Sequence, residues 1–537
     1  MPFAGPVPAR RFVPGIAGLA AILAVVASAG VGLAAHASGR TLAGALSDGY
    51  VIRVAGFTVF QAGLSTLLSV MLAIPFARAA HRRRHLIAVR AMLALASLAF
   101  VTPVIIGVFG IVELHGRAGW VHQGAAMLGL DPGSYIYGLT GILIAHLFFN
   151  MPFAARNMVH ALDGVTPETW RLAAQLGFNQ RQIFRLIEWP ALRAVLFPTA
   201  AVIFALCFTS FAVVLTLGGG PRATILEVAI YQALRFEFDI DRAVALALVQ
   251  IVLAGTLAGM IAAWARALPL EPPSGRRHER PDIASLGPRV FDGAAILLAA
   301  LIFILPLAGI VLPSLAALTP ERLEDPALWR AAGWSAAIAL TAGLISLTIG
   351  LGLLHAVREL GPRLGLVRAA AALEGVGSIV LVTPPVLLGA GLFLALRHEI
   401  DVFASAPALV IAVNAIAVLP FVLRFLGPAM RRTAALDDRL CFSLGIDGWA
   451  RWRLIDWPQL RPAAGTALGV ATAMAAGDLG VIALFGSPDI TTLPLLIYQR
   501  MGAYRMEDAA MGVAVLMLIA GGLIIVLERI AGGRAHA

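Results

Sequence analysis

Apolar stretches long enough to cross a membrane recur along the whole chain, separated by short polar segments. A helix needs about 20 mainly apolar residues to cross a bilayer. Twelve stretches approach that length, with cores at residues 16–35, 55–76, 92–114, 138–159, 195–217, 243–263, 294–315, 331–354, 370–396, 407–426, 464–484 and 509–526. The pattern predicts an all-α, polytopic membrane protein with about twelve transmembrane helices.

The composition supports this class and excludes several functions. Of the 537 residues, 60% are hydrophobic and only 13% are charged, whereas soluble domains carry roughly 25% charged residues. All 40 basic residues are arginine, because the sequence contains no lysine. A P-loop ATPase needs its lysine to reach the phosphates, so this chain alone is not such an ATPase. The arginines lie in short loops between apolar stretches, so the net charge of +10 does not indicate a nucleic-acid partner.

The arginines also predict the orientation of the chain. Loops on one side of the membrane are rich in arginine: Arg10, Arg11, Arg78, Arg82, Arg83, Arg84, Arg90, the segment from Arg266 to Arg289, Arg358, Arg363, Arg368, Arg431, Arg432, Arg529 and Arg534. The opposite loops carry fewer, such as Arg40, Arg117, Arg222 and Arg505. Cytoplasmic loops carry an excess of basic residues, so we expect both termini in the cytoplasm. The first apolar stretch also fits a cleavable signal ending near Ala35-His36-Ala37, although an even number of spans needs no cleavage.

The sequence repeats itself at a nearly constant offset. Pro152 recurs as Pro420, an offset of 420 − 152 = 268, and Gly177 and Gly445 share that offset. Val101-Thr102-Pro103 recurs as Val382-Thr383-Pro384 at a larger offset, and these prolines are expected to kink the third and ninth spans. The pattern predicts two parallel six-helix repeats. They cover residues 1–267 and 291–537 and are joined by a proline- and arginine-rich cytoplasmic linker at 268–290.

A long amphipathic loop follows the fourth span of each repeat, at residues 166–190 and 434–458, and we call the two segments the amphipathic loops. In the first, Thr166 is placed to cap a helix that begins at Pro167, and Gly177 is placed to end it. A proline stands thirteen residues beyond each glycine, since 190 − 177 = 13 and 458 − 445 = 13. The alternative interpretation is an ordinary amphipathic surface helix. The presence of the same pattern in both halves of the chain favours this alternative less.

This glycine-to-proline spacing resembles the cytoplasmic EAA loop of ABC-importer permeases. The resemblance implies that each loop docks on one copy of a separate cytoplasmic ATPase, which binds ATP and Mg, so this chain would hold no cofactor. The residues it assigns to this contact are Arg171, Leu172, Ala173, Ala174, Gly177, Pro190, Arg439, Leu440, Cys441, Gly445 and Pro458. Arg171 and Arg439 stand where the family has glutamate, so the glutamate contact of the family is missing here.

Further stretches resemble the fused thiamine and thiamine pyrophosphate importer permeases of Gram-negative bacteria. They include Leu217-Gly218-Gly219-Gly220-Pro221, Ala229-Ile230-Tyr231-Gln232 and Ala483-Leu484-Phe485-Gly486. The resemblance implies a type I importer fold in the inner membrane and a periplasmic thiamine-binding protein as a partner. It also implies import of thiamine, and of its phosphates, by alternating access.

Polar residues within apolar stretches are candidates for the translocation pathway. Asp478 is the clearest, since a carboxylate would assist the cationic thiazolium ring of thiamine; the alternative is a buried aspartate that caps a helix. Asn150 and Asn414 either face substrate or bond between helices. The repeated pairs Tyr231-Gln232 and Tyr498-Gln499 are expected in short periplasmic gate helices, or packed against the outer ends of spans.

Three rival functions differ in what they require. A ferric-iron permease of the same fused type would have a pathway lined by acidic or tyrosine oxygens at several levels. A secondary transporter with twelve spans would not need the two amphipathic loops. A membrane enzyme lacks support, because the sequence shows no paired catalytic carboxylates, histidine cluster or nucleophile motif, and no metal-ligand set is predicted.

Overall fold

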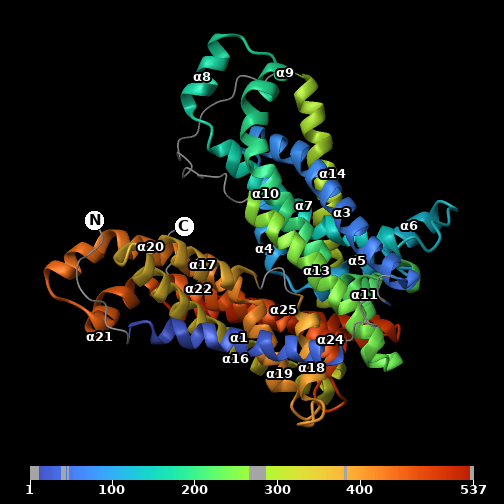
Figure 1. Cartoon of the computed structure of the whole chain (residues 1–537). Helices are drawn as coiled ribbons and strands as arrows, with labels where there is room; N and C mark the ends of the chain where they lie inside the picture. The colour runs from blue at the N-terminus through green and yellow to red at the C-terminus, as the bar shows by residue number, and fades with distance from the viewer. Residues whose placement is uncertain (1–10, 38–43, 45–46, 265–285, 380–383, 533–537) are drawn as a thin grey trace.

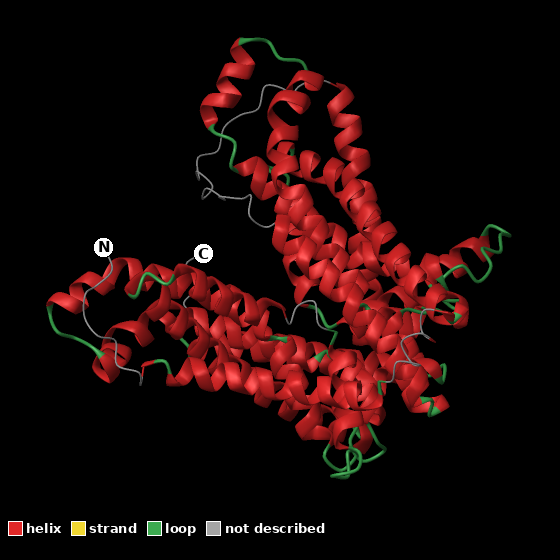
Figure 2. Ribbon diagram, viewed as in Figure 1, coloured by secondary structure: helices red, strands yellow, loops and turns green. Residues whose placement is uncertain are grey.

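The computed structural model describes residues 11–37, 44, 47–264, 286–379 and 384–532. Across these ranges every regular element is a helix, as Figure 2 shows. Most of the predicted linker, and Val382-Thr383 of the repeated proline motif, lie outside the described residues. The all-α prediction is confirmed.

The first part of the chain forms a series of long helices separated by short ones. Its α-helices are α1 (Val13–His36), α3 (Gly49–Arg82), α4 (Ile87–Val101), α5 (Val104–His115), α6 (Trp120–Met127), α7 (Leu139–Asp163), α8 (Pro167–Gln175), α9 (Gln180–Ile183), α10 (Trp189–Phe208), α11 (Phe211–Leu217), α12 (Leu226–Gln232) and α13 (Ile240–Trp264).

The second part follows a similar order. Its α-helices are α14 (Leu286–Ala316), α15 (Pro320–Leu323), α16 (Pro326–Arg358), α17 (Val367–Ile379), α18 (Pro385–Leu396), α19 (Ala406–Ala417), α20 (Leu419–Ser443), α21 (Gly448–Arg451), α22 (Trp457–Ala476), α23 (Gly480–Phe485), α24 (Leu493–Gly502) and α25 (Met506–Ile530).

In the described ranges, ten helices are long and apolar enough to span a membrane, or eleven if α19 and α20, bent by 42°, count as one span. Each predicted span overlaps a helix or a helix pair. The third is broken at Pro103, where α4 ends at Val101 and α5 begins at Val104. Proline has no N–H to donate and its ring clashes with the preceding turn, so the break follows from the sequence. In the ninth, α18 begins directly after Pro384.

The long helices form two arms (Figure 1). One arm contains α3, α7, α10 and α14, and the other contains α1, α16, α20 and α22. The arms diverge toward α8 and α9 on one side and toward α20 and α21 on the other. They come together around α5, α11, α18 and α24, where α5 packs against α24 and α25 and α12 packs against α18. A continuous cluster of buried apolar side chains, including Phe109, Phe148 and Phe485, fills this junction.

The first helix of each predicted repeat packs on the helices of the other. Helix α1 lies against α16 and α18, and α14 lies against α3 and α5. Glycines make the close approach possible: a Cβ on Gly32 would lie 2.1 Å from the carbonyl oxygen of Gly391, and one on Gly110 would lie 2.7 Å from that of Pro306. Small residues that allow backbones to meet are typical of helix packing in membranes. These two crossings tie the two predicted repeats together, so each arm contains helices from both.

Candidate functional site

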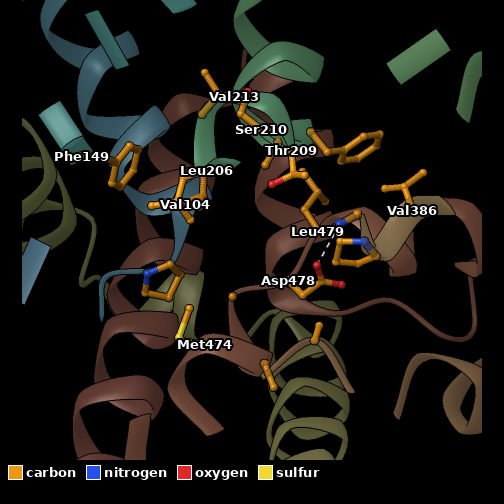
Figure 3. A pocket seen from close by; sticks show the side chains of 18 of the residues that line it. Val104, Phe149, Leu206, Thr209, Ser210, Val213, Val386, Met474, Asp478 and Leu479 are labelled. Atoms are coloured by element: carbon orange, nitrogen blue, oxygen red, sulfur yellow. Dashed lines mark hydrogen bonds between the residues drawn. The ribbon is translucent and has the colours of Figure 1, made fainter. Parts of the chain in front are cut away.

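A cavity of about 300 Å³ lies where the two arms meet. Three residues predicted for the pathway, Asn150, Asn414 and Asp478, line it together. Figure 3 shows that its walls come from both predicted repeats, with Val104 and Phe149 from one and Asp478 and Leu479 from the other. The sequence identified these residues separately, and the fold brings them to one site.

Asp478 occupies the turn between α22 and α23. Its Oδ1 accepts a hydrogen bond from the Gly480 N–H at 3.3 Å, and its Oδ2 accepts one from the Val481 N–H at 3.2 Å. The side chain therefore caps the first turn of α23, as one of the two interpretations expected. It also keeps part of its surface accessible because it faces the cavity (Figure 3). Asp478 can therefore cap α23 and also face the predicted pathway.

The two asparagines are buried in the cavity wall. The Asn150 side-chain amide donates to the sulfur of Cys207 at 3.2 Å, which links α7 to α10. Asn414 on α19 is 2% exposed and lines the cavity together with Asp478. Asn150 thus makes a bond between helices, and Asn414 contributes a buried amide to the same cavity as Asp478.

Two lining residues were missed by the sequence analysis. Glu227 on α12 is 1% exposed, and His146 on α7 is 2% exposed. His146 Nδ1 lies 2.7 Å from the Ser65 hydroxyl. The signal that could have found Glu227 is a single acidic residue within the apolar segment 225–230. This segment follows a glycine-rich turn, so the sequence predicts an external loop there, where an acidic residue is not conspicuous.

The predicted gate segments form short helices, α12 and α24. Each begins at a hydroxyl from a long helix: the Leu226 N–H donates to Thr58 Oγ1 at 3.1 Å, and the Leu493 N–H donates to Ser335 Oγ at 2.8 Å. Three of the four predicted residues, Tyr231, Tyr498 and Gln499, line a second cavity of about 580 Å³; Gln232 does not. Their role as a gate stays a prediction.

The first amphipathic loop folds as two helices around a glycine. Trp170 and Ala173 of α8 are buried against Ile183 and Ile187, whereas Arg171, Leu172 and Ala174 are exposed. The helix begins at Pro167 as expected, but Thr166 does not cap it; the Thr166 hydroxyl instead lies 3.0 Å from that of Thr169. Position 166 is extended, the conformation that a following proline favours, and from it the hydroxyl meets the Thr169 hydroxyl and not a main-chain N–H.

The second amphipathic loop differs from the first. Helix α20 runs without a break to Ser443, whereas α7 ends at Asp163 and α8 is separate. The sequence explains this, because Gly164 and Pro167 have Arg432 and Ala435 as their counterparts, and these favour a continuous helix. Within α20, Arg439 and Leu440 are exposed and Cys441 is buried.

Both loops turn at the predicted glycines. Gly177 has φ of +63° and Gly445 has φ of +64°, the left-handed conformation expected of a helix C-terminus. The Phe178 N–H donates to the Ala173 carbonyl at 3.0 Å, and the Ile446 N–H donates to that of Cys441 at 2.9 Å. The two loops therefore end their exposed helices with the same geometry.

Neither Pro190 nor Pro458 ends the helix in which it lies. A five-residue π-helical segment precedes each proline, at Phe184–Glu188 and Trp452–Asp456, and the helix continues as α10 or α22. Each segment ends in a buried carboxylate that pairs with an arginine of a long helix. Glu188 lies 2.6 Å from Arg78 of α3, and Asp456 lies 3.1 Å from Arg358 of α16. These ion pairs fix both amphipathic loops to the ends of α3 and α16.

Similarity to known proteins decides the class of this molecule. Residues 65–265 match the family model described as the binding-protein-dependent transport system inner membrane component. The thiamine transport system permease protein of Brucella abortus (strain 2308) is 41% identical over 536 residues, which cover 99% of this chain and 97% of that protein. The corresponding protein of Escherichia coli (strain K12) is 39% identical over 97% of this chain and 96% of its own length.

The chain belongs to this permease family. It is thus a multi-pass transport subunit of the membrane, as the sequence predicted. The ferric transport system permease protein of Actinobacillus pleuropneumoniae is 26% identical, over 35% of the permease and 27% of its own length. No solved structure matches the permease significantly.

Proposed function

We propose that this permease imports thiamine, and its phosphates, from the periplasm to the cytoplasm of a bacterium by alternating access. The observation that carries this proposal is the near full-length similarity to thiamine transport permeases. It is supported by a cavity whose described lining residues include Asp478 and no arginine. A carboxylate at this depth favours a cation over an anion, and thiamine carries a thiazolium cation.

The chain comprises two parallel repeats, residues 1–267 and 291–537, joined by a cytoplasmic linker at 268–290. Each amphipathic loop binds one copy of a cytoplasmic ATPase, and both termini lie in the cytoplasm. The exposed Arg171 and Leu172 on α8, with Arg439 and Leu440 on α20, support this assignment because they form matching outward faces on the two arms. The start of α1 lies near the second of these faces, since Arg11 pairs with Asp447 at 2.7 Å.

At the opposite end, a periplasmic thiamine-binding protein docks over α12 and α24 and releases its cargo into the pathway. ATP binding draws the two ATPase copies together, and the loops carry that movement to α3 and α16 through Glu188 and Asp456. The permease itself performs no chemistry, because ATP and Mg are held by the ATPase.

The proposal is tested with the permease–ATPase complex in liposomes, given either a thiamine-loaded or an iron-loaded binding protein. We expect ATP hydrolysis to be stimulated by the thiamine-loaded protein, and stimulation by the iron-loaded protein alone would overturn the cargo. Asp478→Asn keeps the shape of the side chain and one acceptor oxygen at the start of α23, but it removes the charge and replaces the other acceptor with an NH2 group. We expect it to lower thiamine uptake about tenfold or more; unchanged uptake would remove Asp478 from the pathway.

A further inference from the structure

Two carboxylates from different repeats face the same cavity. Glu227 belongs to α12 in the first repeat and Asp478 to the turn before α23 in the second, and both line the space between the arms. The polar neighbours of Glu227 include the main chain of Phe211 and the amide of Gln250, but in the described structure its two oxygens make no hydrogen bond of good geometry.

Placing both carboxylates in one cavity costs free energy unless another group compensates for their charge. The buried Glu227 carboxylate loses its hydration without gaining a hydrogen-bond partner, and a second carboxylate in the same cavity repels it when both are charged. Within the described part of the chain, the residues that line the cavity include no arginine, and the sequence contains no lysine. His146 also lines the cavity, and its Nε2 has no hydrogen-bond partner in the described part of the chain. Three unsatisfied or half-satisfied polar groups therefore face one small cavity.

The remaining walls suit a flat organic cation. Phe149, Phe211 and Phe421 line the cavity alongside the carboxylates. Aromatic faces attract cations, more strongly when water is excluded. A volume of about 300 Å³ is at the lower end of the range for small-molecule pockets, roughly 300–1,000 Å³. The site is thus large enough for a cationic ring and its substituents.

We propose that Glu227 and Asp478 form one intramembrane binding site for an organic cation, with each repeat supplying one carboxylate. The inference rests on the proposed function and names the residues that would recognise its cargo. A cation held between the two carboxylates reduces their mutual repulsion and links α12 to the start of α23. Because α12 also carries Tyr231 of the second cavity, occupation of the site is coupled to the predicted gate.

The test measures direct binding to the purified permease–ATPase complex in lipid nanodiscs. The probes are thiamine, an analogue whose thiazolium is replaced by an uncharged ring, and tetramethylammonium as a competitor. Glu227→Gln and Asp478→Asn preserve side-chain size and remove one charge each. Glu113→Gln is the matched control, because Glu113 is a half-buried carboxylate of α5 that does not line the cavity.

We expect Glu227→Gln to raise the Kd for thiamine about tenfold or more, with Glu113→Gln near wild type and the uncharged analogue bound equally by all variants. An unchanged thiamine Kd in Glu227→Gln would overturn the site even if thiamine-loaded binding protein still stimulates ATP hydrolysis. If thiamine fails to bind but tetramethylammonium binds and depends on Glu227, the site stands and the proposed cargo is wrong.

A second measurement tests the site in the wild-type complex, so that it does not depend on the folding of Glu227→Gln or Asp478→Asn. Wild-type complex is treated with a hydrophobic carbodiimide, and labelling of each carboxyl is measured by mass spectrometry. We expect Glu227 to be labelled and thiamine to protect it, with Glu113 unaffected by thiamine. Labelling of Glu227 that thiamine does not change would contradict direct contact with the cation.

Discussion

Gly177 and Gly445 show how single residues set the shape of the amphipathic loops. Both adopt positive φ, and a Cβ at either position would meet no atom within 4 Å. The requirement for glycine is therefore conformational and not steric, since left-handed backbone costs other residues about 1–2 kcal/mol. Asparagine tolerates this conformation better than alanine does.

We predict that Gly177→Ala weakens the coupling of the first loop, with Gly177→Asn intermediate between Ala and wild type. A strain of about 1 kcal/mol should lower stimulated ATP hydrolysis several-fold while leaving expression and membrane insertion unchanged. The control is Gly124→Ala on α6, whose φ is not positive and whose Cβ would also meet open space. Equal activity of the alanine and asparagine variants would show that the backbone conformation does not matter.

Residue-level prediction succeeded where the signal was local. The glycine ends and the break at Pro103 follow from conformational limits that apply within a few residues. The cavity could not be predicted from such local limits. Asn150, Glu227 and Asp478 come from segments far apart in sequence, and only packing brings them together. Asp478 was found because a charge in an apolar stretch is conspicuous, whereas Glu227 sits beside a turn, where acidic residues are common.

At the scale of elements, the apolar pattern located the spans but not their partners. All apolar helices present similar surfaces to lipid, so hydropathy could not show that α1 packs on α16 and α18 while α14 packs on α3 and α5. Small residues specify which helices pack together. Gly15, Gly18 and Gly32 of α1 each face a backbone or a methyl group of the opposite repeat. Their partners become visible only in the fold.

We predict that Gly32→Ala destabilises the molecule, because its Cβ would lie 2.1 Å from the Gly391 carbonyl oxygen. Overpacking of this kind costs about 1–3 kcal/mol. Gly30→Ala is a closely matched control in the same helix, since its Cβ would meet nothing within 4 Å and alanine favours helix. Thermal unfolding of the purified permease in nanodiscs should show a lower Tm for Gly32→Ala only. Equal Tm values would mean that α1 does not pack closely on α18.

At the scale of the whole molecule, the arms join at one end and separate at the other. The contacts between α5 and α24 and between α12 and α18 hold the joined end, where the cavity and the predicted gate lie. The amphipathic loops lie at the separated ends (Figure 1). Buried ion pairs attach each loop to its own arm, so movement of a loop should move the arm as a unit.

We predict that the two loops approach each other when the ATPase binds ATP. Gln175 and Ser443 hold equivalent exposed positions on α8 and α20, so spin labels on Gln175→Cys and Ser443→Cys report the separation of the arms. The native Cys207 and Cys441 are buried and are replaced in this background. Pulsed electron resonance of the complex should give a shorter mean distance with ATP under non-hydrolysing conditions than without nucleotide.

The control pair is Gln175→Cys with Val290→Cys, which both lie on the first arm. Val290 is 72% exposed, and the neighbouring Asp292 of α14 pairs with Arg82 and Arg83 at the end of α3. Because these ion pairs hold α14 to the same arm as α8, the control distance should not change with nucleotide. A change within the arm without one between the arms would contradict rigid-body closure. It would instead indicate that the first amphipathic loop moves independently of α3, so that the pair of Arg78 and Glu188 does not transmit its motion.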